Sequence, residues 1–357
     1  MNNPLKQSVG IDVSKDTLDI AINVLGSDFK IDVLSTSQFT NNREGIKRIM
    51  NWIKKFMIKD LPLQVVLEAT GVYHELVTNT LHDNGFRIAV VMANKIKNYV
   101  RSTDVRSIND KISAKQIAEF GLVKNLENWE KPDASLQELK VLSRERLQLI
   151  RDRTRAKNQQ HAMDHSCASS QASKKRINQH LKFLDKQINQ VEKDILTLVQ
   201  ETSWLNEKIQ KICTIKGIGV ITVISIIAET DGFNLIRNIP QLVCYAGYDV
   251  VHKESGTSVK TKARISHKGN KHIRQALYFP ALSAVKYEKY FTKFYDRLFD
   301  RQKIKMKSYV AVQRKLLILI YVLWKKNEEY KSDRHNQYNY LGQPKKAALT
   351  ELDHVRS

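Results

Sequence analysis

The chain has 357 residues, enough for two domains and a connecting element. It carries 59 lysines and arginines against 37 acidic residues, and this formal net charge of +22 predicts a polyanionic partner, nucleic acid above all. A generally basic protein without such a partner is the alternative. The sequence shows neither a membrane-spanning apolar run nor a signal peptide, and its cysteines are widely spaced. We therefore expect a cytoplasmic protein with no membrane partner and no disulfide framework.

Residues 1–130 predict an α/β domain. Strands are expected over residues 9–13, 17–22, 31–34, 63–67 and 87–92. Helices are expected over residues 44–56, 73–84 and from 110 onward. The short connection Ser14-Lys15-Asp16 indicates a hairpin between the first two strands. Three antiparallel strands followed by alternating strands and helices is the ribonuclease H-like order.

Three carboxylates stand at the ends of these predicted elements. Asp12 closes the first strand, Glu68 closes the strand over 63–67, and Asp110 opens a helix. Carboxylates gathered at one sheet edge repel each other unless a cation lies between them, so we expect a divalent ion that acts on phosphate. Mg²⁺ fits because it is a hard ion that prefers oxygen ligands. The alternative is that each is an ordinary loop acid, or for Asp110 a helix cap.

Residues 131–205 predict a coiled-coil linker and oligomerisation element. Apolar residues follow a heptad seam at Ile177, Leu181, Leu184, Ile188, Val191, Ile195 and Leu198. The partner of this helix is either the preceding helix, from Leu136 to about Lys157, or a helix of another subunit. That preceding helix is strongly basic, which fits either a solvated face or phosphate contact. Residues 161–173 are expected to form the hairpin tip, where His161, His165 and Cys167 are too few to predict a zinc site.

Residues 206–330 predict a second, mostly helical domain, followed by a loose tail over 331–357. The run Ile215-Lys216-Gly217-Ile218-Gly219-Val220 before an apolar helix has the form of a helix-hairpin-helix element. In such an element Lys216, Gly217 and Gly219 would approach a phosphate. A plain turn is the competing interpretation.

Residues 254–274 form a basic stretch that includes a candidate nucleophile. Ser255 is followed by Gly256, and a serine there needs a base or a metal to help remove its proton. Cations that would hold phosphate stand at Lys260, Lys262, Arg264, Lys268, Lys271 and Arg274. A basic phosphate-binding loop is the simpler interpretation, and chemistry alone does not separate Ser255 from Ser258 or Ser266.

Together these motifs resemble the DEDD insertion-sequence transposases, which include the Piv-type DNA invertases and the bridge-RNA-guided serine recombinases. The N-terminal motifs are Val9-Gly10-Ile11-Asp12-Val13-Ser14-Lys15, Glu68-Ala69-Thr70-Gly71-Val72-Tyr73 and Asn109-Asp110-Lys111-Ile112-Ser113-Ala114. The C-terminal motifs are Ile215-Lys216-Gly217-Ile218-Gly219, Tyr245-Ala246-Gly247, Glu254-Ser255-Gly256, Ser266-His267-Lys268-Gly269-Asn270 and Arg314-Lys315-Leu316-Leu317. Their joint order and spacing are far more specific than any one of them.

The resemblance implies an N-terminal RuvC-like domain, a coiled-coil linker and a C-terminal transposase domain. It implies that Asp12, Glu68 and Asp110 bind Mg²⁺ and that Ser255 attacks DNA to form a covalent phosphoserine link. It also implies a composite site in a homodimer or homotetramer, and a noncoding bridge RNA that pairs with donor and target DNA.

The chain departs from the family pattern at one acid. The family reads Asp-x-x-Asp where this chain has Asp110-Lys111-Ile112-Ser113, so Ser113 replaces the fourth acid. We expect a working RNA-guided DNA transposase, either because three acids suffice or because an acid such as Asp16 or Asp104 substitutes. The alternatives are a RuvC-like metal-dependent nuclease or junction resolvase, and a catalytically weakened nucleic-acid-binding protein.

Overall fold

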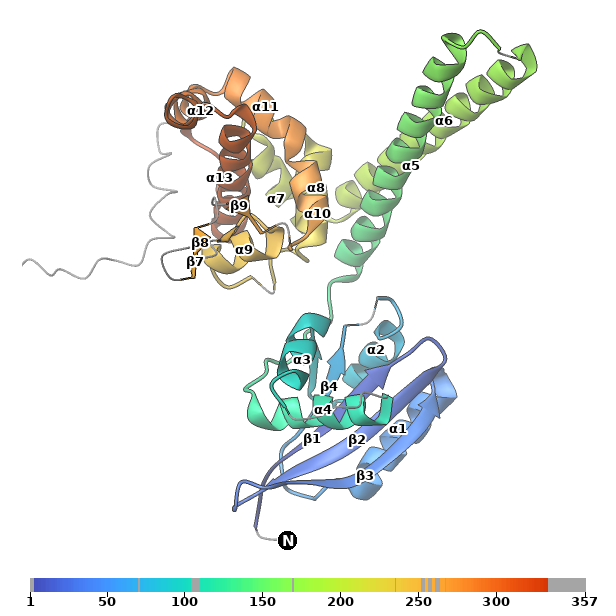
Figure 1. Cartoon of the computed structure of the whole chain (residues 1–357), viewed down its shortest axis with the longest axis vertical. Coiled ribbons are helices and arrows are strands. Elements are labelled where there is room, and N and C mark those ends of the chain that lie inside the picture. The colour runs from blue at the N-terminus through green and yellow to red at the C-terminus, as the bar shows by residue number, and fades with distance from the viewer. Residues whose placement is uncertain are drawn as a thin grey trace, which may run out of the picture. The chain divides into compact units, whose positions relative to one another are not determined.

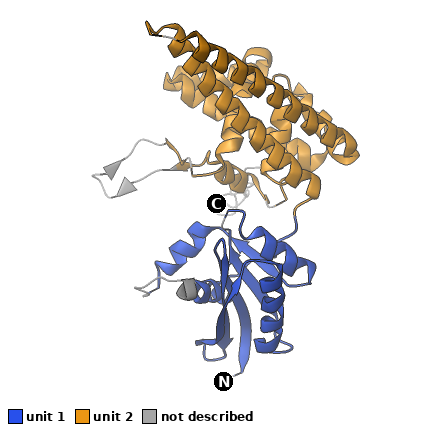
Figure 2. Cartoon of the chain, turned by 90° about the vertical axis from the view of Figure 1, so that its right-hand side faces the viewer, with its two compact units in different colours: residues 1–131 blue, residues 132–357 orange. Residues whose placement is uncertain are grey.

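The computed structural model describes residues 3–69, 71–103, 110–168, 170–234, 236–251, 254–255, 259–260, 264–266 and 268–332. For residues 110–112, 251, 254, 255, 259 and 260 it describes the backbone alone. The chain forms two compact units, Met1–Lys131 and Pro132–Ser357 (Figure 2). The predicted further division at residue 205 stays a prediction, and the tail predicted over 331–357 lies outside the described residues beyond position 332.

The first unit is built on a five-stranded mixed sheet (Figure 1). Its strands are β1 (Pro4–Val13), β2 (Thr17–Gly26), β3 (Ile31–Thr40), β4 (Leu63–Glu68) and β5 (Ile88–Val91). Their order is β3-β2-β1-β4-β5, antiparallel from β1 to β3 and parallel from β1 to β5. This arrangement confirms the predicted ribonuclease H-like order. The prediction made β3 too short, because its second half is polar and partly exposed, as is usual for an edge strand.

Helices cover the two faces of this sheet. They are α1 (Arg43–Phe56), α2 (Glu75–Asp83), α3 (Ala93–Val100) and α4 (Asp110–Val123). One face of β1 and β2, including Ile11 and Ile20, packs on the isoleucines of α1. The other face packs on α4 and α3, with Val66 against Ile117. The sequence analysis missed α3, a helix of eight residues in which Ile96 alone is buried, because so short a segment gives no repeated apolar spacing.

The second unit opens with a long helical hairpin, α5 (Ala134–Asp164) and α6 (Gln171–Glu201). The two helices pack on each other, with ion pairs Arg146–Glu192 at 2.6 Å and Arg153–Asp185 at 3.0 Å. The heptad seam of α6 is therefore buried against α5, the first of the two partners expected for it, and the predicted role of this hairpin in oligomerisation stays a prediction. The seam ends at the buried Val199, with Leu198 only half-buried, because the helix drifts from an ideal heptad.

Helix α5 is longer than predicted, and the tip is shorter. The helix continues to Asp164, so the turn occupies residues 165–170. The rings of His161 and His165 stack at 4.2 Å between centroids.

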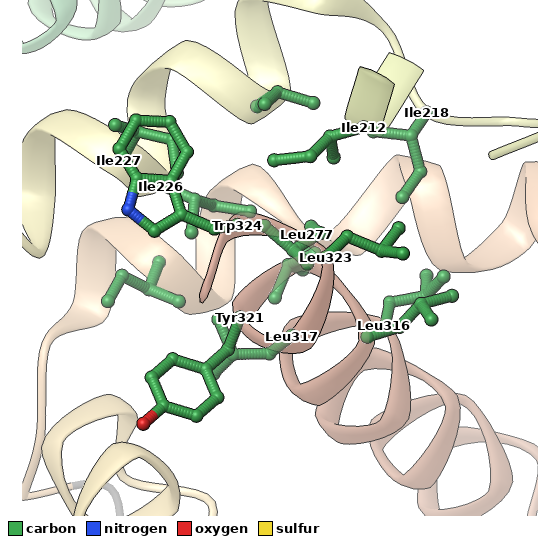
Figure 3. Packing of buried hydrophobic residues seen from close by; sticks show 14 of the residues in the cluster. Ile212, Ile218, Ile226, Ile227, Leu277, Leu316, Leu317, Tyr321, Leu323 and Trp324 are labelled. Carbon is green, nitrogen blue, oxygen red and sulfur yellow. The ribbon is translucent and has the colours of Figure 1, made fainter. Parts of the chain in front are cut away.

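The remaining helices form a bundle around α13 (Lys305–Lys326). The others are α7 (Ser203–Cys213), α8 (Val220–Glu229), α9 (Ile239–Ala246), α10 (Lys271–Ala276), α11 (Tyr278–Tyr287) and α12 (Lys289–Gln302). Leu316, Leu317 and Leu323 of α13 lie in the core with Ile212 of α7 and Ile227 of α8 (Figure 3). No helix among the described residues is long and apolar enough to cross a bilayer.

Candidate active site

Asp12 and Glu68 lie at the ends of two neighbouring parallel strands. The paired residues of β1 and β4 run up to Ile11 and Leu67, so the next residue on each strand is one of the two acids. Neighbouring strands lie about 4.8 Å apart, which places the two backbones in direct adjacency. Both side chains are half-buried. The structure therefore brings together two of the predicted metal ligands.

Helix α4 lies directly on this face of β1, and Gly10 makes that possible. A Cβ atom on Gly10 would come within 2.2 Å of the carbonyl oxygen of Ala114 and 2.3 Å of the amide nitrogen of Ala118. Asp12 stands two residues further along the strand and so points to the same face as Gly10. Glu68 is likewise two residues beyond Val66, which packs on α4. Both acids thus face the side of the sheet that α4 covers.

The start of α4 lies at the same end of the sheet as these acids. A Cβ on Gly121 would lie 2.3 Å from Oγ of Ser8, while Gly10 lies under Ala114 and Ala118, so the helix runs opposite to β1. From Ser8 to Asp12 the strand advances about 13 Å, and eight helical residues advance about 12 Å. The first turn of α4, which contains Asp110 and Ser113, therefore falls at the level of Asp12. The side chain of Asp110 lies outside the described residues.

A further acid, which the sequence analysis did not consider, lies beside Asp12. Asp19 of β2 is the direct partner of Asp12 in the antiparallel pair, so the two side chains point to the same face. Asp19 is only 3% exposed. Because residues 12 and 19 are almost equally distant from the turn at 14–16, counting along the predicted hairpin would have found it.

Burial sets the electrostatics of this group of acids. It raises the pKa of Glu68 above its usual value, because desolvation disfavours the charged carboxylate. A bound cation would oppose that effect. Among the described side chains, no three histidine, cysteine, aspartate or glutamate residues come close enough to form a complete metal site. A site at this edge would thus need Asp110, or water between the ion and some of its acids.

The serine motif of the second unit forms a small hairpin. Strand β7 (Glu254–Ser255) pairs with β8 (Val259–Lys260), and Ser255 is the partner of Val259. A second pair, β6 (Val250–Val251) with β9 (Arg264–Ile265), lies next to it in the chain. The side chains of Ser255 and Lys260, and all of Ser258 and Lys262, lie outside the described residues. Ser266, the third candidate serine, donates its hydroxyl to Asp249.

The predicted phosphate-binding residues divide into exposed and structural ones. Arg264, Lys268 and Lys271 are exposed. Arg274 donates from Nη1 to the carbonyl oxygen of Ala246 at 2.7 Å, so its guanidinium supports the fold. Lys216 is exposed in the turn between α7 and α8.

The two glycines of that turn have different surroundings. Gly217 has φ +91°, and a Cβ there would lie 2.8 Å from the amide nitrogen of Ala284 in α11. The positive φ and the contact with α11 therefore explain why position 217 is a glycine, without a bound phosphate. Gly219, at the N-terminus of α8, has open space where a Cβ would be and stays the candidate for phosphate contact.

Two C-terminal motifs, residues 245–247 and 266–270, pack against each other through their glycines, next to an ion pair whose carboxylate is buried. A Cβ on Gly269 would lie 2.2 Å from the amide nitrogen of Gly247, so the two backbones touch. The Asn270 amide donates to Glu229 Oε2 at 2.7 Å, and Arg144 of α5 donates to Glu229 Oε1 at the same distance. The motifs thus fix the basic segment after β9 against α5 and α8. Helix α5 carries seven lysines and arginines, and four of them form ion pairs with acidic side chains: Arg144, Arg146, Arg153 and Arg155.

The fold and the adjacent acids define the first unit as a RuvC-like domain of the ribonuclease H class. Comparison with known families gives two matches. A family of DEDD transposases of the IS110 type, described as "Transposase", matches residues 9–163. The "Transposase IS116/IS110/IS902 family" matches residues 209–296. The chain belongs to the IS110 family of DEDD transposases, which are enzymes of DNA recombination and bind DNA.

Individual proteins are also similar to this chain. The Pilin gene-inverting protein of Moraxella bovis is 27% identical over 336 residues, which cover 92% of this chain and 99% of the relative. The protein of the same name from Moraxella lacunata matches to the same extent. Among solved structures, Thermus thermophilus RuvC aligns with 34% of this chain and 99% of its own, at 12% identity and a TM-score of 0.28. Its complex with a Holliday junction aligns at 11% identity and a TM-score of 0.27, over 35% of this chain and 99% of its own.

Proposed function

We propose that this transposase is a Mg²⁺-dependent, RNA-guided recombinase, working in the cytoplasm, that cleaves and rejoins strands of its insertion element and target DNA. The observation that carries the proposal is the adjacency of Asp12 and Glu68 at parallel strand ends, under a helix that begins with Asp110. The net charge of +22 supports it, since such a charge suits two polyanionic partners.

Asp12, Glu68 and Asp110 would hold the ion. Their carboxylate oxygens are the hard donors that Mg²⁺ prefers, and DEDD families typically use divalent metals. When bound, Mg²⁺ stabilises negative charge on phosphate and promotes loss of a proton from a nucleophile. The protein's own part is to hold the acids at one sheet edge, with α4 closing one face.

Ser255 would act as the nucleophile. Its hydroxyl oxygen forms a bond to the DNA phosphorus and loses its proton, while the bond from phosphorus to a sugar oxygen breaks and that oxygen gains a proton. One phosphoester replaces another, so rejoining needs no outside energy source. The exposed cations Arg264, Lys268 and Lys271 would hold the phosphates.

The serine assignment is tested by trapping a covalent protein–DNA adduct. Wild type should form the adduct, Ser255→Ala should form none yet still bind nucleic acid, and Ser258→Ala should behave as wild type. A persistent adduct in Ser255→Ala would refute this role. Cleavage without any adduct would favour the RuvC-like nuclease, which attacks with water.

A composite site between subunits is tested by complementation. Asp12→Asn and Ser255→Ala should each be inactive alone. When mixed, they should regain part of the activity, because one subunit supplies the acids and another the serine of the same homodimer or homotetramer. Absence of recovery under conditions where subunits exchange would place both halves of the site in one chain.

Guidance by a bridge RNA is tested by purifying the protein with its bound nucleic acid and sequencing it. The expected species is a structured noncoding RNA encoded beside the gene. The affinity of the protein for this RNA should fall steeply as the salt concentration rises, because lysines and arginines that contact phosphates displace counterions from the RNA. Recombination that survives complete removal of RNA would exclude guidance.

A further inference from the structure

Three polar residues stand side by side across the sheet at the level of the candidate metal site. Asp19 is paired with Asp12 on one side and with Gln38 of β3 on the other. Directly paired residues of antiparallel strands point to the same face, and neighbouring strands lie about 4.8 Å apart. With Glu68 next to Asp12 on β4, three carboxylates occupy consecutive strands on one face.

Neighbouring contacts confirm which face this is. The Asn23 amide, four residues along β2 from Asp19, donates to the carbonyl oxygen of Lys115 in α4 at 3.1 Å. Leu18 and Ile20, which flank Asp19 in the chain, lie in the core on the opposite side with α1. Because side chains alternate along a strand, Asp19 shares the α4 face with Asp12 and Gly10.

The carboxylate of Asp19 is only half satisfied. Gln38 donates from Nε2 to Oδ2 at 2.9 Å, while Oδ1 is buried and has no hydrogen-bond partner. Asp19 is 3% exposed, so water does not replace the missing bond freely. An ionised carboxylate in this state, next to a second acid, is unfavourable unless positive charge or a donor arrives. The arrangement indicates that the free oxygen of Asp19 interacts with a group that binds beside Asp12.

We propose that Asp19 is the fourth carboxylate of the metal site, an outer acid that accepts a hydrogen bond from water on the ion and adds negative charge behind Asp12. This inference rests on the proposed function. An outer position agrees with the absence of a compact group of three ligands among the described side chains. Mg²⁺ keeps several of its waters, so an acid can act on it without contact. Asp19 thereby offsets the charge that Ser113 does not supply.

The test is to measure Mg²⁺ affinity and metal-free stability of the full chain on the same variant. Asp19→Asn should bind Mg²⁺ about 10-fold more weakly in calorimetric titration, the range found when outer partners of metal ligands are lost. In EDTA it should melt at a higher temperature than wild type, because it removes a buried, half-paired charge. A purely structural residue would not lower metal affinity while raising metal-free stability. Adding Ser113→Asp to this variant should restore affinity.

Two further variants separate this inference from the metal site itself. Asp32→Asn removes an exposed acid of β3 and should bind Mg²⁺ as wild type does. Asp12→Asn should lose binding, and wild-type affinity in that variant would refute the site as a whole. If Asp12→Asn loses binding while Asp19→Asn keeps it, the role of Asp19 alone is overturned. Lower stability of Asp19→Asn in EDTA, or failure to fold, overturns it as well.

Discussion

Replacing Gly10 with alanine tests whether the active site depends on direct contact between β1 and α4. The added Cβ would lie 2.2 Å from the carbonyl oxygen of Ala114 and 2.3 Å from the amide nitrogen of Ala118. Ordinary contact begins at 3.4 Å, so strand and helix must separate by 3.4 − 2.2 Å, about 1.2 Å. Both obstacles are backbone atoms, which are unable to rotate away as a side chain does.

The size of the effect follows from this geometry. Overpacking of a core costs about 1–3 kcal/mol, and the rigid obstacles place Gly10→Ala near the upper limit. The same displacement moves the first turn of α4 away from Asp12. A shift of about 1 Å in a catalytic group costs about 100-fold in rate, so recombination should fall by about that factor.

Urea denaturation measures the loss in free energy of unfolding, and a recombination assay on the same preparation measures the loss in rate. Gly121→Ala is the matched control in the same interface. Its Cβ would meet side-chain atoms, Oγ of Ser8 at 2.3 Å and Cγ2 of Val66 at 2.7 Å, and alanine is favoured in a helix by about 1 kcal/mol. We expect it to lose at least about 1 kcal/mol less than Gly10→Ala. Equal stability of the two variants would refute the reasoning.

Three other predictions follow from the same structure. Ser113→Asp should keep or raise recombination, whereas a clear loss would show that serine is required there. Arg144→Ala should lower the free energy of unfolding by about 2–3 kcal/mol, because the Glu229 side chain is 2% exposed and would lose its counter-ion. Adding Glu229→Gln should recover part of this loss, and an unchanged loss in the double variant would contradict the pairing. Burial opposes ionisation of Glu229, yet Arg144 and Asn270 outweigh it and hold its pKa below the usual 4.5. The stabilisation of the fold by ionised Glu229 is therefore fully present above pH 4.5 and is lost as the pH falls through the lowered pKa. Glu229→Gln has no carboxylate to protonate, so its melting temperature should fall less on acidification than that of wild type.

Amino-acid order alone was enough to predict the fold class and to select two residues of the candidate site. Alternating apolar residues predicted the strands, and their order predicted a ribonuclease H-like sheet. Asp12 and Glu68 could be selected because strand ends meet at one edge of a parallel sheet, and that edge is readable from chain order. The heptad seam likewise predicted a long helix, since its period is local.

Which residues face each other across the sheet and between helices became known from the three-dimensional structure. The pairing of residues 12 and 19 places a buried acid beside the site, and a one-residue shift of register would have turned it to the opposite face. The seam packs on α5 of its own chain, and Gly10 lies under α4; neither partner is encoded in local periodicity. Local sequence patterns indicate whether a segment forms a helix or a strand and which of its faces is apolar. The identity of the neighbour depends on pairing between distant segments, which is settled only when the whole core packs.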